Sequence, residues 1–132
     1  MTIWKRIENT CPSFGQCRKN RMTIKLAFVG TGYVAKIHAT AAQKLNDVQL
    51  AAVVNHRQES MAKFAKQFDI PRQYTRLEDL LADGGVDAMS INTPNYLHAP
   101  QTIIALNAGV HVMVEKPIAM NAGEAKAMLE AT

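Results

Sequence analysis

The sequence predicts an α/β fold of the Rossmann type, with a doubly wound parallel sheet, and three observations lead to this prediction. Short β-branched runs alternate with helical patterns from Ile24 onward, as in strands joined by crossover helices. The strands are almost continuously apolar, which favours strands buried on both faces. A turn with two glycines, Gly30 and Gly32, follows the first strand.

The elements follow one another along the chain as strand, helix, strand, helix. Strands are predicted at residues 24–29, 48–54, 88–92 and 110–114, with a weakly signalled strand at 73–75. Helices are predicted at 34–45, 59–68, 77–81, 98–107 and 122–131. In the second helix the apolar residues recur at three- and four-residue spacing, so they are assigned to the core: Met61, Phe64, Ala65 and Phe68.

Length and composition indicate one folded domain at residues 23–132, preceded by a poorly ordered basic extension at 1–22. The chain has 132 residues, of which 48% are hydrophobic. Residues 1–25 hold six lysines and arginines against Glu8 alone, so the rest is close to neutral despite a net charge of +4. We therefore expect no nucleic-acid partner.

The positions of the two cysteines and the length of the apolar runs indicate whether a metal site or a membrane span is expected. Cys11 and Cys17 lie in the extension without a histidine cluster, so neither a disulfide framework nor a metal site is expected. No apolar run approaches the length of a membrane span, and no signal peptide is recognised. A cytoplasmic protein without a membrane partner is the expectation.

The glycine turn has the context that phosphate binding requires, a strand before it and a helix after it. Gly30 permits the tight bend, Gly32 lets the backbone approach a pyrophosphate, and Ala35 allows close helix packing. The first helical residues, Tyr33 and Val34, stand at a helix N-terminus that attracts anions. An ordinary strand-to-helix loop is the alternative, and the βαβ context makes it the weaker one.

The end of the second strand bears on cofactor choice. An NAD site usually has an acidic residue here for the ribose hydroxyls, and this chain has Asn55. Asn55 can bond a hydroxyl without repelling a 2′-phosphate, and His56 and Arg57 can bind that phosphate. The sequence thus slightly favours NADP over NAD, although Arg57 as a solvated charge that opens the next helix is a competing interpretation.

Two further strands end in polar residues, in "VDAMSINTPNYLH" (86–98) and "GVHVMVEKP" (109–117). Ligands of open α/β sheets bind at the carboxyl ends of the strands. With "GTGYVAKIH" these stretches resemble the amino-terminal domain of the Gfo/Idh/MocA oxidoreductases, a family named for glucose-fructose oxidoreductase and inositol dehydrogenase. The resemblance runs from about Lys25 to the end, and Glu-Lys-Pro after a strand is its most specific element.

The resemblance implies roles for the residues at these strand ends. Cofactor-binding positions are Asn92, Thr93, Pro94, Asn95, His98, Glu115 and Lys116. The resemblance also makes Lys116 catalytic: it faces the reacting carbon and moves the hydroxyl proton while a hydride passes to or from nicotinamide. The competing interpretations are a surface lysine for Lys116 and a histidine that only bonds backbone for His98. His38, after the glycine turn, is expected to pack beneath the nucleotide and is given no chemical role.

The family implies a sugar, cyclitol or related polyol as substrate, held mostly by a second domain that this sequence lacks, together with a last Rossmann strand. Two interpretations stay open: a fragment of a dehydrogenase that binds cofactor without turnover, and a stand-alone nucleotide-binding or redox-sensing regulator. A methyltransferase is disfavoured because Asn55 replaces the usual carboxylate. An apolar strand at 110–114 on the sheet edge would favour homo-oligomers.

Overall fold

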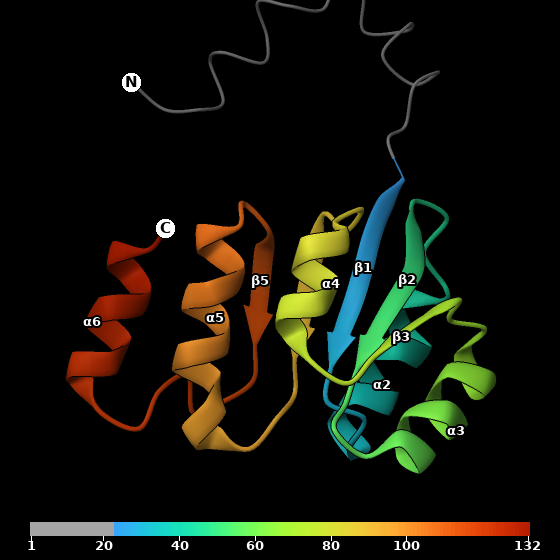
Figure 1. Ribbon diagram of the computed structural model, residues 1–132, viewed down its shortest axis with the longest axis horizontal. Helices are drawn as coiled ribbons and strands as arrows, with labels where there is room; N and C mark the ends of the chain where they lie inside the picture. The colour runs from blue at the N-terminus through green and yellow to red at the C-terminus, as the bar shows by residue number, and fades with distance from the viewer. Residues whose placement is uncertain (1–22) are drawn as a thin grey trace, which may run out of the picture.

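The computed structural model describes residues 23–132, which form a five-stranded parallel sheet with helices on both faces (Figure 1). The strands lie in the order β3-β2-β1-β4-β5. The chain winds outward from β1 to β3, then returns to the other side of β1, so the order reverses between β1 and β4. The strands are β1 (Ile24–Val29), β2 (Val48–Val54), β3 (Arg72–Tyr74), β4 (Ala88–Ile91) and β5 (His111–Val114). The predicted doubly wound Rossmann class is confirmed.

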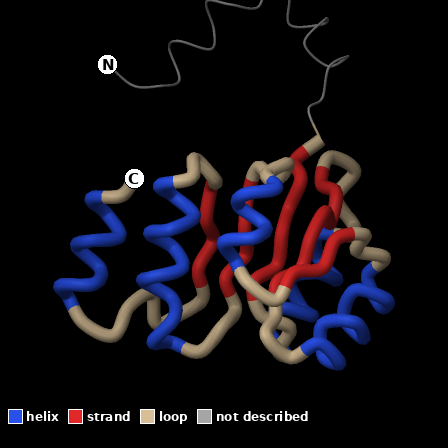
Figure 2. The backbone as a smooth tube through the Cα atoms, in the orientation of Figure 1, coloured by secondary structure: helices blue, strands red, loops and turns tan. Residues whose placement is uncertain are grey.

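The helices lie in two layers around the sheet, visible on both sides of the strands in Figure 2. Helices α2 and α3 pack on one face, and α4 and α5 cover the other. Helix α6 packs beside α5 (Figure 1). The bounds are α2 (Tyr33–Ala42), α3 (Gln58–Phe68), α4 (Leu77–Asp83), α5 (His98–Asn107) and α6 (Ala122–Glu130), with a short 3₁₀ turn, η2, at Asn95–Leu97.

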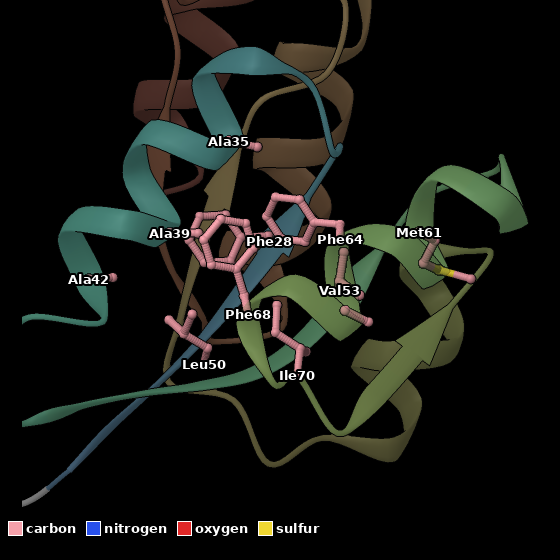
Figure 3. Packing of buried hydrophobic residues seen from close by; sticks show 11 residues of the cluster. Phe28, Ala35, Ala39, Ala42, Leu50, Val53, Met61, Phe64, Phe68 and Ile70 are labelled. Atoms are coloured by element: carbon pink, nitrogen blue, oxygen red, sulfur yellow. The ribbon is translucent and has the colours of Figure 1, made fainter.

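Aromatic packing holds α3 against the sheet (Figure 3). The Phe64 ring lies 5.7 Å from Phe28 of β1 and 4.8 Å from Phe68, measured between ring centroids. All three side chains are buried. The helical spacing of Phe64 and Phe68 predicted that both lie in the core, and this prediction is confirmed.

The expectation that every strand is buried on both faces is wrong for β5. Met113 is 51% exposed and His111 is also exposed, whereas Val112 and Val114 pack against the cluster beneath α5. Met113 pairs with Ser90, so both face the α2 side of the sheet. Helix α2 does not reach over this edge strand, and β5 is covered on one face only.

Several predicted boundaries shift by one to three residues, two of them for identifiable reasons. Helix α2 ends at Ala42 rather than at residue 45, because the N–H of Leu45 bonds the carbonyl three residues back and closes a tighter turn. Strand β5 begins after Val110, whose N–H bonds Ala105 of α5 instead of the sheet. Helix α4 continues to Asp83, two residues beyond its predicted end. The weak strand at 73–75 exists as β3, and the predicted extension at 1–22 lies outside the described residues, as do both cysteines.

Strand β3 is fastened to the loop after α4 by side chains. The Arg72 guanidinium donates to the carbonyls of Gly84 and Gly85, each at 2.8 Å. The Tyr74 hydroxyl donates to Asp83 at 2.9 Å, and this hydrogen bond raises the pKa of Tyr74 above its ordinary value of 10.0. These bonds fix the chain just before Thr75.

Candidate functional site

The turn between β1 and α2 requires glycine at position 30. The φ of Gly30 is +91°, and a Cβ there would lie 2.7 Å from the carbonyl oxygen of Asn92. Its N–H donates to the Val54 carbonyl at 2.9 Å. The turn therefore fits tightly between the ends of β2 and β4, at the point where the strand order reverses.

Gly32 differs, because nothing in the described protein requires it to lack a side chain. Its φ is −72°, which any residue adopts, and a Cβ would meet no atom within 4 Å. It forms the N-cap of α2 without a capping side chain, and no acidic residue lies in the first turn. This helix end suits an anion that approaches the backbone closely.

A groove of about 920 Å³ opens beside this turn at the carboxyl ends of β1, β2 and β4. It is lined by eight of the residues that the sequence nominated: Gly30, Gly32, Asn55, His56, Arg57, Asn92, Thr93 and Pro94. Sequence reasoning missed other lining residues, among them Thr31, Ser60, Thr75, Arg76, Tyr96 and Gln101. The position of Thr31 between the two glycines was a signal for it, whereas no sequence pattern marks which faces of α3 and α5 meet the groove.

The end of β2 is held by a chain of three polar side chains. The amide of Asn55 donates to the Thr31 hydroxyl, which lies 2.8 Å from the hydroxyl of Ser60 on α3. With its N–H₂ group directed at Thr31, Asn55 keeps its carbonyl oxygen to accept a hydrogen bond, as from a ribose hydroxyl.

Several charged or ionisable side chains lie at the same end of the groove. Arg57 and His56 are exposed and line it. Arg76 also lines it and pairs with Glu78 at 3.6 Å. Glu78 also lines the groove and offsets Arg76, so the net positive charge at this end comes from Arg57.

His98 opens α5 as predicted, and its ring is buried and does not line the groove. It is 1% exposed, with Nδ1 2.8 Å from the carbonyl oxygen of Pro117 and Nε2 2.8 Å from that of Thr93. The Thr93 hydroxyl in turn donates to Gln101 of α5 at 2.6 Å. The ring is enclosed between the loops that follow β4 and β5, so we assign His98 to holding them together.

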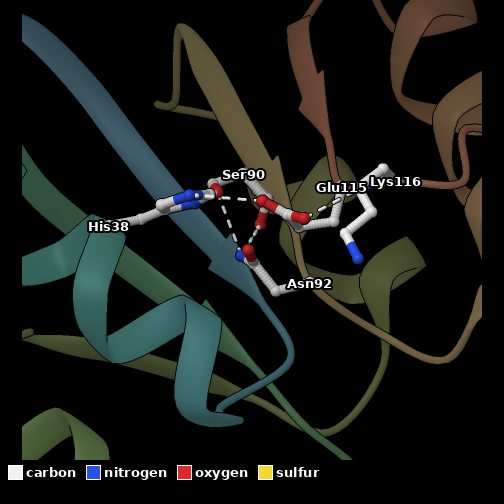
Figure 4. Close-up of polar contacts among 5 residues, drawn as sticks. All are labelled: His38, Ser90, Asn92, Glu115 and Lys116. Atoms are coloured by element: carbon white, nitrogen blue, oxygen red, sulfur yellow. Dashed lines mark hydrogen bonds and ion pairs between the residues drawn. The ribbon is translucent and has the colours of Figure 1, made fainter.

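Four side chains form a further network on the α2 side of β4 and β5 (Figure 4). His38 of α2 lies 3.3 Å from the Ser90 hydroxyl through Nδ1 and 3.3 Å from Glu115 through Nε2. The Asn92 amide donates to the Ser90 hydroxyl at 2.9 Å. Glu115 also accepts the backbone N–H of Lys116 at 3.2 Å.

The remaining nominated residues do not line the groove. The side chains of Tyr33, 80% exposed, and Val34 lie on the first turn of α2, so a contact there would come from their backbone. Asn95 opens the η2 turn and is exposed. Lys116 is exposed past β5, and in Figure 4 no ion pair joins its ammonium to Glu115.

Residues 23–132 hold neither a cluster of metal-binding side chains nor a membrane-spanning helix. No group of three or more histidine, cysteine, aspartate or glutamate side chains in this part of the chain is arranged to hold a metal ion. None of its helices is long and apolar enough to cross a membrane.

Residues 24–132 match the Gfo/Idh/MocA oxidoreductase family, described as an NAD-binding Rossmann fold. The chain belongs to this family. It is 32% identical to scyllo-inositol 2-dehydrogenase (NADP⁺) IolU of Bacillus subtilis over 82% of its length, and 34% identical to D-glucoside 3-dehydrogenase of Escherichia coli over 85%. It spans about a third of these relatives, 33% in both cases.

Solved structures of the family share the fold. Scyllo-inositol dehydrogenase from Lactobacillus casei, with bound NAD(H) and scyllo-inositol, is 31% identical with a TM-score of 0.77, and the match covers 83% of this chain and 32% of that one. The WlbA dehydrogenase from Bordetella pertussis, in complex with NADH and UDP-GlcNAcA, is 31% identical with a TM-score of 0.79, covering 83% and 33%. These likenesses place the chain among the family's Rossmann domains.

Matched substitutions separate the two glycines. Gly32→Val should abolish NADPH binding, because its side chain enters space that the protein leaves open, and should lower stability by no more than about 1 kcal/mol, the cost of an apolar N-cap residue. Gly30→Ala should lower stability by about 1–3 kcal/mol or more, since it forces a positive φ onto alanine and a clash with Asn92. Thermal denaturation measures the stability of each variant, and fluorescence titration measures its NADPH binding. Unimpaired binding by folded Gly32→Val would contradict the assignment of this turn.

Proposed function

We propose that this chain is the cofactor-binding part of an NAD(P)-dependent dehydrogenase that moves a hydride between nicotinamide and a secondary hydroxyl of a sugar, cyclitol or related polyol. The observation that carries the proposal is Gly32, whose missing side chain leaves the uncapped end of α2 open to an anion. The substrate class rests on relatives named as dehydrogenases of scyllo-inositol and a D-glucoside.

The residues that line the groove support one orientation of the bound dinucleotide. The pyrophosphate belongs over Gly30 and Gly32, at the N-terminus of α2, and the adenosine ribose belongs beside Asn55 at the end of β2. The other half of the molecule must then extend to the opposite side of β1, over the ends of β4 and β5. Asn92 and Thr93 line the groove on that side, and Glu115 and Lys116 follow β5.

The nicotinamide ring, when bound, supplies or accepts the hydride. The protein's part is to hold the ring and to handle the hydroxyl proton. Lys116 carries the proton-handling group: an ammonium beside the reacting carbon stabilises a developing alkoxide, and the free amine accepts the proton in the oxidative direction. His98 positions the Lys116–Pro117 loop through the Pro117 carbonyl.

We further propose that NADP is preferred over NAD. Asn55 brings no negative charge to the β2 end, and the exposed guanidinium of Arg57 lies beside it on the groove. A charge-assisted hydrogen bond to a 2′-phosphate contributes about 1.5–3 kcal/mol, which corresponds to a preference on the order of 10- to 150-fold.

Titration with NADPH and NADH tests both statements. We expect NADPH to bind more tightly, and Arg57→Ala to remove most of the difference by weakening NADPH alone. Lys66→Ala is the matched control, since it removes one exposed charge from α3 at a residue that does not line the groove. If the folded chain binds neither nucleotide at millimolar concentration, the proposed function is wrong. If Arg57→Ala leaves the preference intact, Arg57 only contacts solvent.

The 132-residue chain is expected to bind cofactor without turnover. Among the residues assigned to the site, Lys116 alone handles a proton, and it lies exposed rather than in an enclosed substrate pocket. Orientation of a bound substrate is worth about 7–11 kcal/mol of barrier in well-ordered cases, and an open site does not provide it. A panel of polyols and sugars with NADP⁺ tests this, and steady turnover by homogeneous protein would refute it.

We also propose that the chain self-associates through β5. This strand stands at the edge of the described sheet, and Met113 on it is half exposed. Unpaired edge strands with apolar side chains favour pairing with another chain. Solution mass measurement should show dimers or larger species that Met113→Lys reduces. A parent protein that stays monomeric at high concentration would exclude this interface.

A further inference from the structure

His38 joins the helix behind the glycine turn to the loop that carries Lys116. Its ring stands on α2 and reaches Ser90 of β4 on one side and Glu115 past β5 on the other, each at 3.3 Å. The His38 and Glu115 side chains are only 27% and 25% exposed, and Ser90 is 1% exposed. This partial burial makes the contacts less subject to solvent competition than an ion pair at the open surface.

The direction of each hydrogen bond follows from the chemistry of the groups. The Asn92 amide donates to the Ser90 hydroxyl, so the single hydroxyl proton of Ser90 is free to point at Nδ1 of His38. Nδ1 is then an acceptor, and the ring proton belongs on Nε2, which faces the Glu115 carboxylate. One neutral tautomer therefore satisfies every contact from Asn92 to Glu115.

A serine–histidine–carboxylate row raises the possibility of nucleophilic catalysis, and its surroundings argue against that use. Ser90 is buried within β4, where a substrate has no access. Its hydroxyl is occupied by Asn92 and His38. The row is better suited to holding its two ends, the groove-lining Asn92 and the carboxylate of Glu115, in place.

Both ends of the row, Asn92 and Glu115, follow the strands β4 and β5, over which the nicotinamide half is proposed to lie. The side-chain oxygen of Asn92 is buried and has no hydrogen-bond partner among the described residues. At the other end, the second oxygen of Glu115 accepts the N–H of Lys116 at 3.2 Å. Without the proton on Nε2 of His38, the Glu115 carboxylate would keep no other recorded side-chain partner in this part of the chain.

We propose that His38 is a positioning residue: its Nε2–H fixes Glu115, and through Glu115 the start of the Lys116 loop, for the nicotinamide half of the cofactor. The inference rests on the proposed function and adds to it a residue of α2 remote from the adenosine end. His38 would thereby connect the element that holds the phosphates with the loop that handles the proton.

Two substitutions at His38 test the roles of the two ring nitrogens separately. His38→Asn retains an acceptor near the position of Nδ1 and lacks the reach to Glu115, whereas His38→Gln places an amide donor near the position of Nε2. We expect His38→Asn to lose on the order of ten-fold in NADPH affinity, the loss typical of one hydrogen bond to a charged group. His38→Gln should recover part of that loss.

Adenosine 2′,5′-bisphosphate provides the matched ligand, because it carries the adenosine and its two phosphates but lacks the nicotinamide half. Its affinity should be the same in the parent, His38→Asn and His38→Gln. Equal losses for NADPH and the bisphosphate would indicate general damage to the fold and would overturn the positioning role. NADPH affinities in both variants equal to the parent value would also overturn it while leaving the proposed function intact.

The ring tautomer supplies a test that begins with the parent chain alone, without ligand. Nitrogen-15 NMR of the parent chain should show His38 protonated on Nε2 and bare on Nδ1 when the ring is neutral. Glu115→Ala should broaden or shift the Nε2 signal, and the double substitution with His38→Asn should weaken NADPH binding no further than Glu115→Ala alone. A neutral His38 protonated on Nδ1 would refute the inference even if the chain bound no nucleotide.

Discussion

The close contact between the glycine turn and the end of β4 is the constraint on which the site depends. Gly30 lies so near the Asn92 carbonyl that a single added carbon would clash at 2.7 Å. This proximity brings the N-terminus of α2 to the place where the strand order reverses, and there the ends of β2 and β4 diverge. The groove, the polar chain at Asn55 and the row at His38 all extend from this junction.

The elements that could be predicted are those with a local signal of sufficient length. Strand β2 and helix α5 begin and end at the predicted residues because apolar runs and turn residues bound them. The end of α2 and the start of β5 differ from the prediction because the N–H groups of Leu45 and Val110 bond carbonyls outside the regular helix and sheet patterns. The exposure of Met113 escaped prediction because a strand's apolar sequence does not record whether a helix reaches over it.

The site residues likewise fall into those that the sequence could predict and those that it could not. Gly30, Gly32 and Asn55 could be nominated from the sequence because their roles depend on the strand-turn-helix context next to them. Ser60 and Gln101 could not, since each reaches the groove only through the packing of its helix on the sheet. The position of His98 shows the same limit: its two carbonyl partners are 5 and 19 residues away, and the longer separation is fixed only in three dimensions.

The contacts of the buried His98 ring with two loops have a consequence for local unfolding. Because the ring lies within 2.8 Å of the carbonyl oxygens of both Thr93 and Pro117, neither loop can open far without disturbing the contact of the ring with the other. Backbone segments linked in this way tend to open as one cooperative unit. The loops after β4 and β5 should therefore share a single opening free energy, and a fluctuation that begins near α6 would also loosen the floor of the groove at Thr93.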